Sequence, residues 1–201
     1  MSLSRLKLGF LASGNGTSAR AIVNAIKAGQ IPAETRLLVS NNRTAPALDW
    51  AREAGVPTLC IPTHADPEGA DESLAAEMAE HGVELIVLSG YLRKLGPATL
   101  ARYGGRILNI HPGPLPAFGG HGMYGRRVHE AVIAAGVAES GAAIHLVDEE
   151  YDRGPIVAQR SVPVEAGDTP ETLEARVTAM EPLFFVETLR KIAEGTLGLP
   201  T

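Results

Sequence analysis

The sequence has very little cysteine. Its 201 residues include one cysteine, Cys60, in the apolar stretch 56–61. A single cysteine excludes a disulfide framework and favours a reducing compartment. No charged residue or histidine stands beside Cys60, so we expect a buried, unreactive thiol rather than a catalytic one.

Long hydrophobic runs are absent as well. No segment approaches the roughly 18 uninterrupted apolar residues that suggest a membrane span. Residues 1–7 include two basic residues but no apolar run closed by a cleavage motif. We therefore expect a cytoplasmic protein that is neither exported nor inserted into a membrane.

Positive charge is also in short supply. The formal net charge is -5 and the isoelectric point is near 5.7, so there is no general attraction to nucleic acid or to an anionic membrane. Any phosphate that the protein binds must be held at a local site. The sequence also lacks a cysteine cluster and an HExxH motif, so we predict no catalytic metal.

What is present is an average globular composition. Hydrophobic residues make up 45% and charged residues 20% of the chain, close to the values of soluble domains. A chain of this length buries a sufficient core without metal or disulfide support. With no internal repeat or linker, residues 1–201 are predicted to form a single domain.

Short apolar strands alternate with amphipathic helices through the first half of the chain. This alternation predicts a Rossmann-like α/β fold, with an open, mostly parallel twisted sheet covered by helices on both faces. The expected strands are residues 6–12, 36–40, 58–61, 85–88 and 106–110. Helices are expected at 45–54 and 69–80, and the apolar residues 21, 22, 25 and 26 indicate a further helix after the first strand.

The second half departs from this alternation. A helix is expected at 126–135, followed by strands at 142–147 and 156–164 with only a turn between them. Strands joined by a turn should pair antiparallel, which makes the sheet mixed. One long helix is expected at 169–195, with Pro170 in its first turn and a kink at Pro182.

A glycine-rich turn joins the first strand to the first helix. It reads Ser-Gly-Asn-Gly-Thr-Ser at 13–18. Backbone N–H groups at such a helix start bind anions, and the hydroxyls of Thr17 and Ser18 add donors. The turn lacks the lysine of a Walker loop and the third glycine of a dinucleotide fingerprint. The pattern favours a phosphate monoester site over the alternative, a tight turn whose Ser or Thr merely caps the helix.

A second polar group closes the fifth strand. Asn109 and His111 are two residues apart, so they face the same side of the strand. They stand at its carboxyl end, where open α/β sheets bind ligands. The three prolines of residues 111–116 then impose a fixed loop. An amide beside an imidazole can stabilise a developing oxyanion, as acyl transfer requires, although the pair could also merely cap the strand.

An acidic turn follows at 148–154. Four carboxylates in five positions usually mark a solvated turn. One of them could instead turn inward to His111, hold it protonated and relay protons. The pattern itself does not say which carboxylate that is.

The other histidines suggest ordinary roles. His64, His81 and His129 show no metal-ligand spacing and are expected at the surface or at helix caps. His145 alternates with apolar residues, so a hydrogen-bonded core histidine is expected there rather than a catalyst. His121 lies in a glycine-rich loop and could reach a substrate.

These residues together resemble the phosphoribosylglycinamide formyltransferase family of folate-dependent enzymes. The resemblance covers nearly the whole chain and implies an enzyme of purine biosynthesis. The matching segments are SGNGTS at 13–18, LSGYLRKLGP at 88–97, NIHPGPLP at 109–116, DEEYDRGPIVAQ at 148–159 and VPVEAGDTPETLEARV at 162–177.

The resemblance implies a reaction and its catalytic residues. The formyl group of 10-formyltetrahydrofolate passes to the amine of glycinamide ribonucleotide through a tetrahedral intermediate. Asn109 and His111 would stabilise the oxyanion, and Asp152 would raise the pKa of His111 and assist proton transfer. We therefore expect the pKa of His111 above about 6.5, unless burial outweighs the ion pair.

The resemblance also assigns the two binding sites, both for small molecules. The ribonucleotide phosphate would lie on the glycine turn, and an acidic residue of the last helix would contact the same substrate. The folate would be lined by the segment after the fourth strand and by the acidic turn. The implied acceptor residues are Gly14, Asn15, Gly16, Thr17, Ser18 and Glu181. The implied folate residues are Leu92, Arg93, Lys94, Leu95 and Asn109, together with Val147, Glu149 and Asp152 of the turn segment 147–152.

Two departures from the family pattern stand out. Ser18 replaces an asparagine of the bacterial members, and its hydroxyl still suits a phosphate. Residues 118–127 form a longer, more glycine-rich loop than in those members. Contacts by this loop, including any by His121, are therefore not carried over, and the oligomeric state stays open.

Of three other functions, a deformylase and a non-catalytic binding module remain as alternatives. A formyltetrahydrofolate deformylase uses the same Asn, His and Asp with water as acceptor but usually carries an additional N-terminal domain. A methionyl-tRNA formyltransferase requires a basic RNA-binding domain, which this acidic chain lacks. A non-catalytic nucleotide-binding module would keep the glycine turn without needing Asn109, His111 and Asp152 together.

Overall fold

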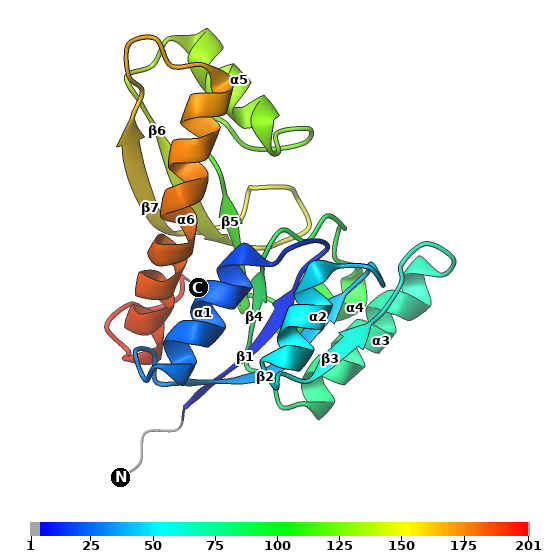
Figure 1. Cartoon of the computed structure of the whole chain (residues 1–201). Coiled ribbons are helices and arrows are strands. Elements are labelled where there is room, and N and C mark those ends of the chain that lie inside the picture. The colour runs from blue at the N-terminus through cyan, green and yellow to red at the C-terminus, as the bar shows by residue number, and fades with distance from the viewer. Residues whose placement is uncertain (1–4, 201) are drawn as a thin grey trace.

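The computed structural model describes residues 5–200 as an α/β sandwich around one sheet (Figure 1). The seven strands lie in the order β3-β2-β1-β4-β5-β6-β7. The strands are β1 (Leu6–Leu11), β2 (Ala33–Ser40), β3 (Thr58–Cys60), β4 (Leu85–Leu88), β5 (Ile107–His111), β6 (Glu139–Leu146) and β7 (Ile156–Pro163). The helices are α1 (Thr17–Lys27), α2 (Pro46–Glu53), α3 (Pro67–Glu80), α4 (Pro97–Tyr103), α5 (Arg126–Ala135) and α6 (Pro170–Ala193).

The sheet is mixed, as the sequence predicts. Strands β1 to β5 pair parallel, and β6 pairs antiparallel with β7. Strand β6 also runs antiparallel to β5, a pairing that the sequence pattern does not reveal. This second pairing decides the site, because it sets residues of β6 directly opposite the polar end of β5.

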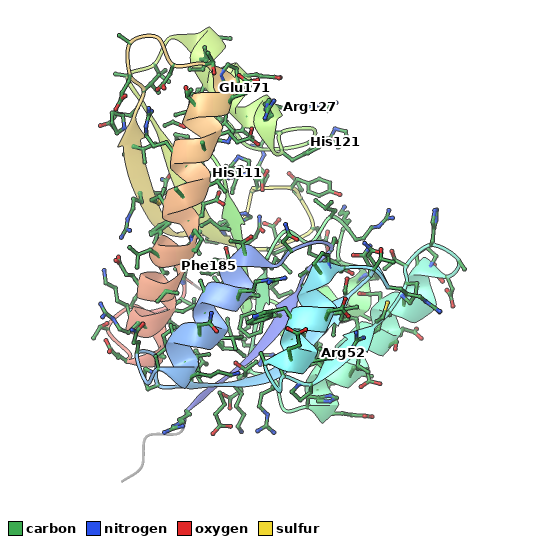
Figure 2. The ribbon with its side chains drawn as sticks, viewed as in Figure 1. Arg52, His111, His121, Arg127, Glu171 and Phe185 are labelled. Carbon is green, nitrogen blue, oxygen red and sulfur yellow. The ribbon has the colours of Figure 1, made fainter. Side chains whose placement is uncertain are left out.

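Helices cover both faces of the sheet, and each face has its own apolar core. On one face α1, α2 and α6 pack on the strands, with Phe10 and Phe185 fully buried. Figure 2 labels Phe185 on α6. On the other face α3 and α4 pack through Met78 and Tyr103. The fold class predicted from alternating strands and helices is therefore confirmed.

Helix α6 is the long helix expected at the end of the chain. It begins after Thr169, whose side chain accepts from the backbone N–H of Thr172 in a capping box. Pro182 lies inside it without ending it, and a kink at that position stays a prediction. The helix packs along α1 and α5, which brings its middle to the same sheet edge as the glycine turn.

One helix of the structure is not predicted from the sequence pattern. Helix α4 starts at Pro97, and its first N–H groups are bound by the carboxylate of Asp71 from α3, at 3.1 Å from Gly96 and 2.8 Å from Ala98. This cap comes from a residue distant in sequence, so Pro97 in the first turn is the local signal that marks the start of the helix. The other elements differ from expectation by a few residues at their ends.

Within residues 5–200, no helix is both long and apolar enough to cross a membrane.

Candidate active site

The polar segments of the sequence meet at the carboxyl edge of the parallel strands. Strands β1 and β4 are neighbours, and the chain leaves β1 toward β2 on one side and returns to β4 on the other. Such a switch point opens a crevice between the loops that follow the two strands. Here those loops are the glycine turn after β1 and Ser89-Gly90 after β4.

The glycine turn leaves the start of α1 open. Gly16 is the N-cap residue, with a φ of 62°, and no side-chain hydrogen bond caps the helix. A Cβ atom at this position would lie 3.1 Å from Cβ of Ala47, so both the backbone angle and the packing favour glycine. The capping alternative for Thr17 and Ser18 is therefore wrong. Thr17 is exposed, whereas Ser18 is buried.

A cavity of about 320 Å³ opens at this helix start. Helices α5 and α6 close its far side and bring in His129, Glu174 and Glu181. Burial raises the pKa of Glu181 to about 7. All the acceptor residues implied by the resemblance line this cavity: Gly14, Asn15, Gly16, Thr17, Ser18 and Glu181.

Asn109 and His111 stand at the end of β5, opposite β6. Asn109 is paired with His145 and His111 with Ala143 in the antiparallel ladder. The Nδ2 atom of Asn109 lies 3.2 Å from Nε2 of His145. The acidic turn after β6 then folds back over this pair.

Asp152 is the carboxylate of the turn that points inward. Its Oδ2 lies 3.4 Å from Nδ1 of His111, and its Oδ1 lies 3.4 Å from Nε2 of His145. Its Oδ2 also accepts from the backbone N–H of Gly120 at 3.0 Å. The backbone of Asp152 has a φ of 57°, a conformation that aspartate tolerates better than most residues. The structure thus brings Asn109, His111 and Asp152 together through His145.

Charges and burial set the protonation of this group. Burial alone would raise the pKa of Asp152, but a hydrogen bond with His145, the charge of His111 and the N–H of Gly120 together lower it. Burial lowers the pKa of His111, and this outweighs the opposing effects of Asp152 and of the Phe118 carbonyl. The exception to the expected rise in the His111 pKa therefore applies: the side chain is only 3% exposed, and burial outweighs the ion pair.

The second nitrogen of His111 is also engaged. Its Nε2 lies 2.7 Å from the carbonyl oxygen of Phe118 in the loop before α5. A carbonyl oxygen only accepts, so Nε2 carries the proton of this bond. Gly113 lets the loop pass closely, since a Cβ there would lie 2.5 Å from Val128 and 3.4 Å from Nε2 of His111.

A smaller cavity of about 90 Å³ lies on the other side of Asn109. Of the folate residues implied by the resemblance, Arg93, Lys94, Leu95, Asn109, Val147, Glu149 and Asp152 line it. Leu92 does not; its side chain is 76% exposed, and its backbone N–H is bound by the Ser13 hydroxyl at 2.8 Å. Tyr91, Arg93, Lys94 and Leu95 also line an adjoining cavity of about 310 Å³.

Sequence reasoning missed two histidines of this region. His145 is buried and hydrogen-bonded as expected, yet it belongs to the polar group itself. His129 is 1% exposed rather than at the surface, and its Nδ1 is buried without a hydrogen-bond partner among residues 5–200. Its position in α5, which faces the acceptor cavity, could be known only once the packing of α5 on α6 was known.

The remaining candidates lie apart from the polar group. His64 is exposed, and His81 is the C-cap residue of α3. His121 is exposed in the loop before α5 (Figure 2), where its ring meets that of Tyr151 edge to face at 6.2 Å. Cys60 is partly exposed rather than buried. Among the described residues, no group of three His, Cys, Asp or Glu is arranged to hold a metal ion.

The same residues place the chain among known proteins. Residues 6–189, which include the whole polar group, match the formyl transferase family. The chain belongs to the formyl transferase family. Its relatives include a chloroplastic phosphoribosylglycinamide formyltransferase from Vigna unguiculata, 40% identical over 196 residues. The phosphoribosylglycinamide formyltransferase of Escherichia coli is 35% identical over 191 residues.

Members of known structure have the same fold. The phosphoribosylglycinamide formyltransferase of Coxiella burnetii has a TM-score of 0.88 and 37% identity, over 98% of this chain and 92% of that one. A formyltetrahydrofolate deformylase from Pseudomonas syringae has a TM-score of 0.84, over 96% of this chain and 62% of that one. At 23% identity, the second likeness concerns the fold alone.

The relatives differ in length. The alignment with the Vigna protein takes in 96% of this chain but 63% of the relative, so the chain spans less than two thirds of it. The alignment with the Escherichia coli protein takes in 94% of this chain and 88% of the relative.

Proposed function

We propose that this formyl transferase moves the formyl group of 10-formyltetrahydrofolate to the amine of glycinamide ribonucleotide. One observation carries the proposal: the end of β5 adjoins two cavities, because Asn109, His145 and Asp152 line the smaller one and Ile110 and Pro112, on either side of His111, line the larger one. The larger cavity begins at an open helix start, and the smaller one has Asn109 in its wall. The transfer of a group from one small molecule to another requires adjoining sites for the donor and the acceptor. The single partly exposed cysteine fits a reducing compartment such as the cytoplasm.

The acceptor cavity suits a phosphorylated substrate. The N–H groups at the start of α1 and the helix dipole attract a phosphate, and Ser18 adds a hydroxyl. Glu181, on the opposite wall, is a hydrogen-bond acceptor for a polar group of the same substrate. The net charge of -5 makes a local site of this kind necessary.

The donor cavity suits the head group of a folate. It combines apolar walls, such as Leu88 and Val147, with backbone and carboxylate groups of the acidic turn. Its volume of about 90 Å³ leaves room for part of a folate, and the adjoining cavity of about 310 Å³ continues past Arg93 and Lys94. Bound here, the folate supplies the formyl carbon.

The residues of the polar group then have distinct tasks. The NH₂ of Asn109 and the Nε2–H of His111 are the donors available to the oxygen of the formyl carbonyl as it gains negative charge. His111 must exchange the Phe118 carbonyl for that oxygen, which replaces one acceptor by another. When Nδ1 of His111 takes up a proton, Oδ2 of Asp152, 3.4 Å away, accepts a hydrogen bond from it, and this offers a route for the proton that the acceptor amine loses.

The test is a coupled absorbance assay that follows loss of the formyl group from 10-formyltetrahydrofolate, with and without glycinamide ribonucleotide. We expect turnover that depends on the ribonucleotide and yields the formylated product. Equal turnover without the ribonucleotide, with release of formate, would instead identify a deformylase. No turnover in either case would leave a non-catalytic nucleotide-binding module.

A matched pair of variants separates the acceptor site from catalysis. Ser18→Ala should raise the acceptor KM more than it lowers kcat, since the hydroxyl binds a phosphate that does not react. Thr44→Ala is the control, because Thr44 is exposed and its hydrogen bonds within residues 5–200 go to the side chain of Asn42.

A further inference from the structure

His145 lies in the middle of the polar group, and none of the tasks above uses it. It stands on β6 directly opposite Asn109 and is 2% exposed. Its Nδ1 lies 2.9 Å from the carbonyl oxygen of Leu146. Because a carbonyl oxygen only accepts, Nδ1 carries a proton as long as this bond exists. Only Nε2 is left to gain or lose a proton.

The Nε2 atom faces two groups at once. The side-chain amide of Asn109 lies 3.2 Å away and Oδ1 of Asp152 lies 3.4 Å away. A bare nitrogen accepts from the amide NH₂ but points its lone pair at the carboxylate. A protonated nitrogen donates to the carboxylate and then requires the amide oxygen on its other side. The two ends of an amide have the same shape, so the hydrogen-bond network determines which end faces the ring.

The carboxylate requires a hydrogen-bond donor beside it. Asp152 presents one oxygen to Nε2 of His145 and the other to Nδ1 of His111, and the second nitrogen of each ring donates to a carbonyl. If both facing nitrogens were bare, an ionised Asp152 would meet two lone pairs. Oδ1 of Asp152 lies 3.4 Å from Nε2 of His145, and a hydrogen bond with His145 helps to lower the pKa of Asp152. A carboxylate oxygen only accepts, so Nε2 of His145 is the donor in this bond.

The ring of His145 has several titratable and charged groups around it. Asp152 lies 3.4 Å from Nε2 of His145, and its other carboxylate oxygen lies 3.4 Å from Nδ1 of His111. The wall of the same cavity further includes Arg93, Lys94, Asp148, Glu149 and Glu150.

We propose that His145 is a positioning residue that aims the amide of Asn109 at the reacting carbonyl. Its Nε2–H is shared by Asp152 and the Asn109 side-chain oxygen, which leaves the Asn109 NH₂ to face the donor cavity. A developing oxyanion requires a donor at this place. A bare His145 nitrogen would keep the NH₂ for itself and turn the amide oxygen toward the oxyanion, which repels it. The inference rests on the proposed function, because it assigns a task within that reaction.

Two substitutions of similar size test the donor role. In His145→Gln the side-chain NH₂ can donate to Asp152 and to the Asn109 oxygen, whereas His145→Leu offers no donor. We expect His145→Leu to lower kcat by about 10², the scale of one lost oxyanion donor, with the acceptor KM within about threefold of the parent. His145→Gln should regain at least about tenfold of that loss. Equal losses in both variants, or near-parent kcat in His145→Leu, would overturn the proposal.

A control separates this effect from general damage to the sheet. Val162→Ala shortens a buried side chain of β7 that lies opposite Ser140 in the ladder, whereas His145 lies opposite Ile156. If Val162→Ala lowers the thermal midpoint as much as His145→Leu but retains kcat, the lower kcat of His145→Leu is caused by removal of the imidazole and not by general destabilisation. If it loses kcat to the same extent, the positioning role is wrong.

A double-mutant cycle shows whether His145 acts through Asn109. In an Asn109→Ala background, His145→Leu should cost about threefold or less, because the amide to be aimed is gone. A loss as large as in the parent would contradict the proposal. Failure of the proposed function is seen separately, in the parent protein without ribonucleotide. A parent that hydrolyses the formyl group would still allow the same ratios to test His145.

Discussion

Replacement of Glu181 by glutamine tests the acceptor cavity through protein stability. Glu181 lies inside α6, and burial raises the pKa of its carboxyl group from 4.5 to about 7. The ionised form is therefore less favourable in the folded protein than in the unfolded chain. Relative to glutamine, Glu181 costs nothing below the unfolded pKa, near pH 4.5, and its cost grows as the pH rises to the folded pKa, near 7.

The size of the effect follows from the two pKa values. A change from 4.5 to about 7, at about 1.4 kcal/mol per pKa unit, corresponds to about 3 kcal/mol. Water that enters the open cavity reduces this value. For a chain of this size, 1 kcal/mol moves the thermal midpoint by about 2–4 °C. We therefore expect Glu181→Gln to raise the midpoint at pH 8 by at least about 3 °C.

The assay is thermal unfolding of parent and variant at several values between pH 4.5 and 8. The difference between them should be near zero at the acid end and should reach its plateau above pH 7. The acceptor KM should rise in the variant, since a charged hydrogen-bond acceptor is lost. A gain in stability with a loss in binding is typical of a residue kept for function.

Glu187 of the same helix is the matched control. Its pKa is lowered by its ion pair with Arg160, so its contribution to stability is present above the usual glutamate pKa and is lost as the pH falls through the lowered value. Glu187→Gln should therefore leave the midpoint unchanged or lower it at pH 8. A midpoint difference for Glu181→Gln that does not change with pH, or destabilisation at pH 8, would refute the reasoning.

Three further predictions concern the site and its turn. Asp152→Asn should lower kcat by about 10². It should also shift the limb of the pH–rate profile that reports His111 to lower pH, because the charge of Asp152, which raises the pKa of His111, is lost; an unshifted limb would contradict this. Bulky apolar residues at both Thr17 and Ser18 should weaken phosphate and acceptor binding in a titration, and unchanged affinity would count against the anion site. Gly154→Ala places Cβ 1.8 Å from a backbone carbonyl oxygen and should lower the thermal midpoint, whereas Gly198→Ala, with open space around it, should not.

The spacing of apolar residues predicted most of the helices and strands, because each element depends mainly on the pattern of its own residues. The parallel strands and the long last helix each carry their own apolar spacing. Helix α4 was missed because its cap, Asp71, comes from another helix. The pairing of β5 with β6 was also invisible, since strand patterns indicate which face is buried but not which strand is the neighbour.

The site was predictable where chemistry is written in adjacent residues and not where packing creates it. Asn109 and His111 stand two apart on one strand, and Asp152 is one of four carboxylates whose direction only the turn decides. His145 resembled a core histidine because its neighbours in sequence are apolar. Its role depends on the opposite strand. The direction of the His111 pKa depended on whether burial or the ion pair with Asp152 is stronger, and the sequence does not show the burial that lowers it.

The most direct test of the proposed reaction centre is the kinetics of His111→Ala. The oxyanion exists only in the transition state, so a donor to it affects kcat and leaves acceptor binding nearly intact. We expect kcat to fall by about 10²–10³ with the ribonucleotide KM close to that of the parent, in a variant shown by its thermal midpoint to be folded. Near-normal kcat with a raised acceptor KM would make His111 a binding residue and contradict its place at the catalytic centre.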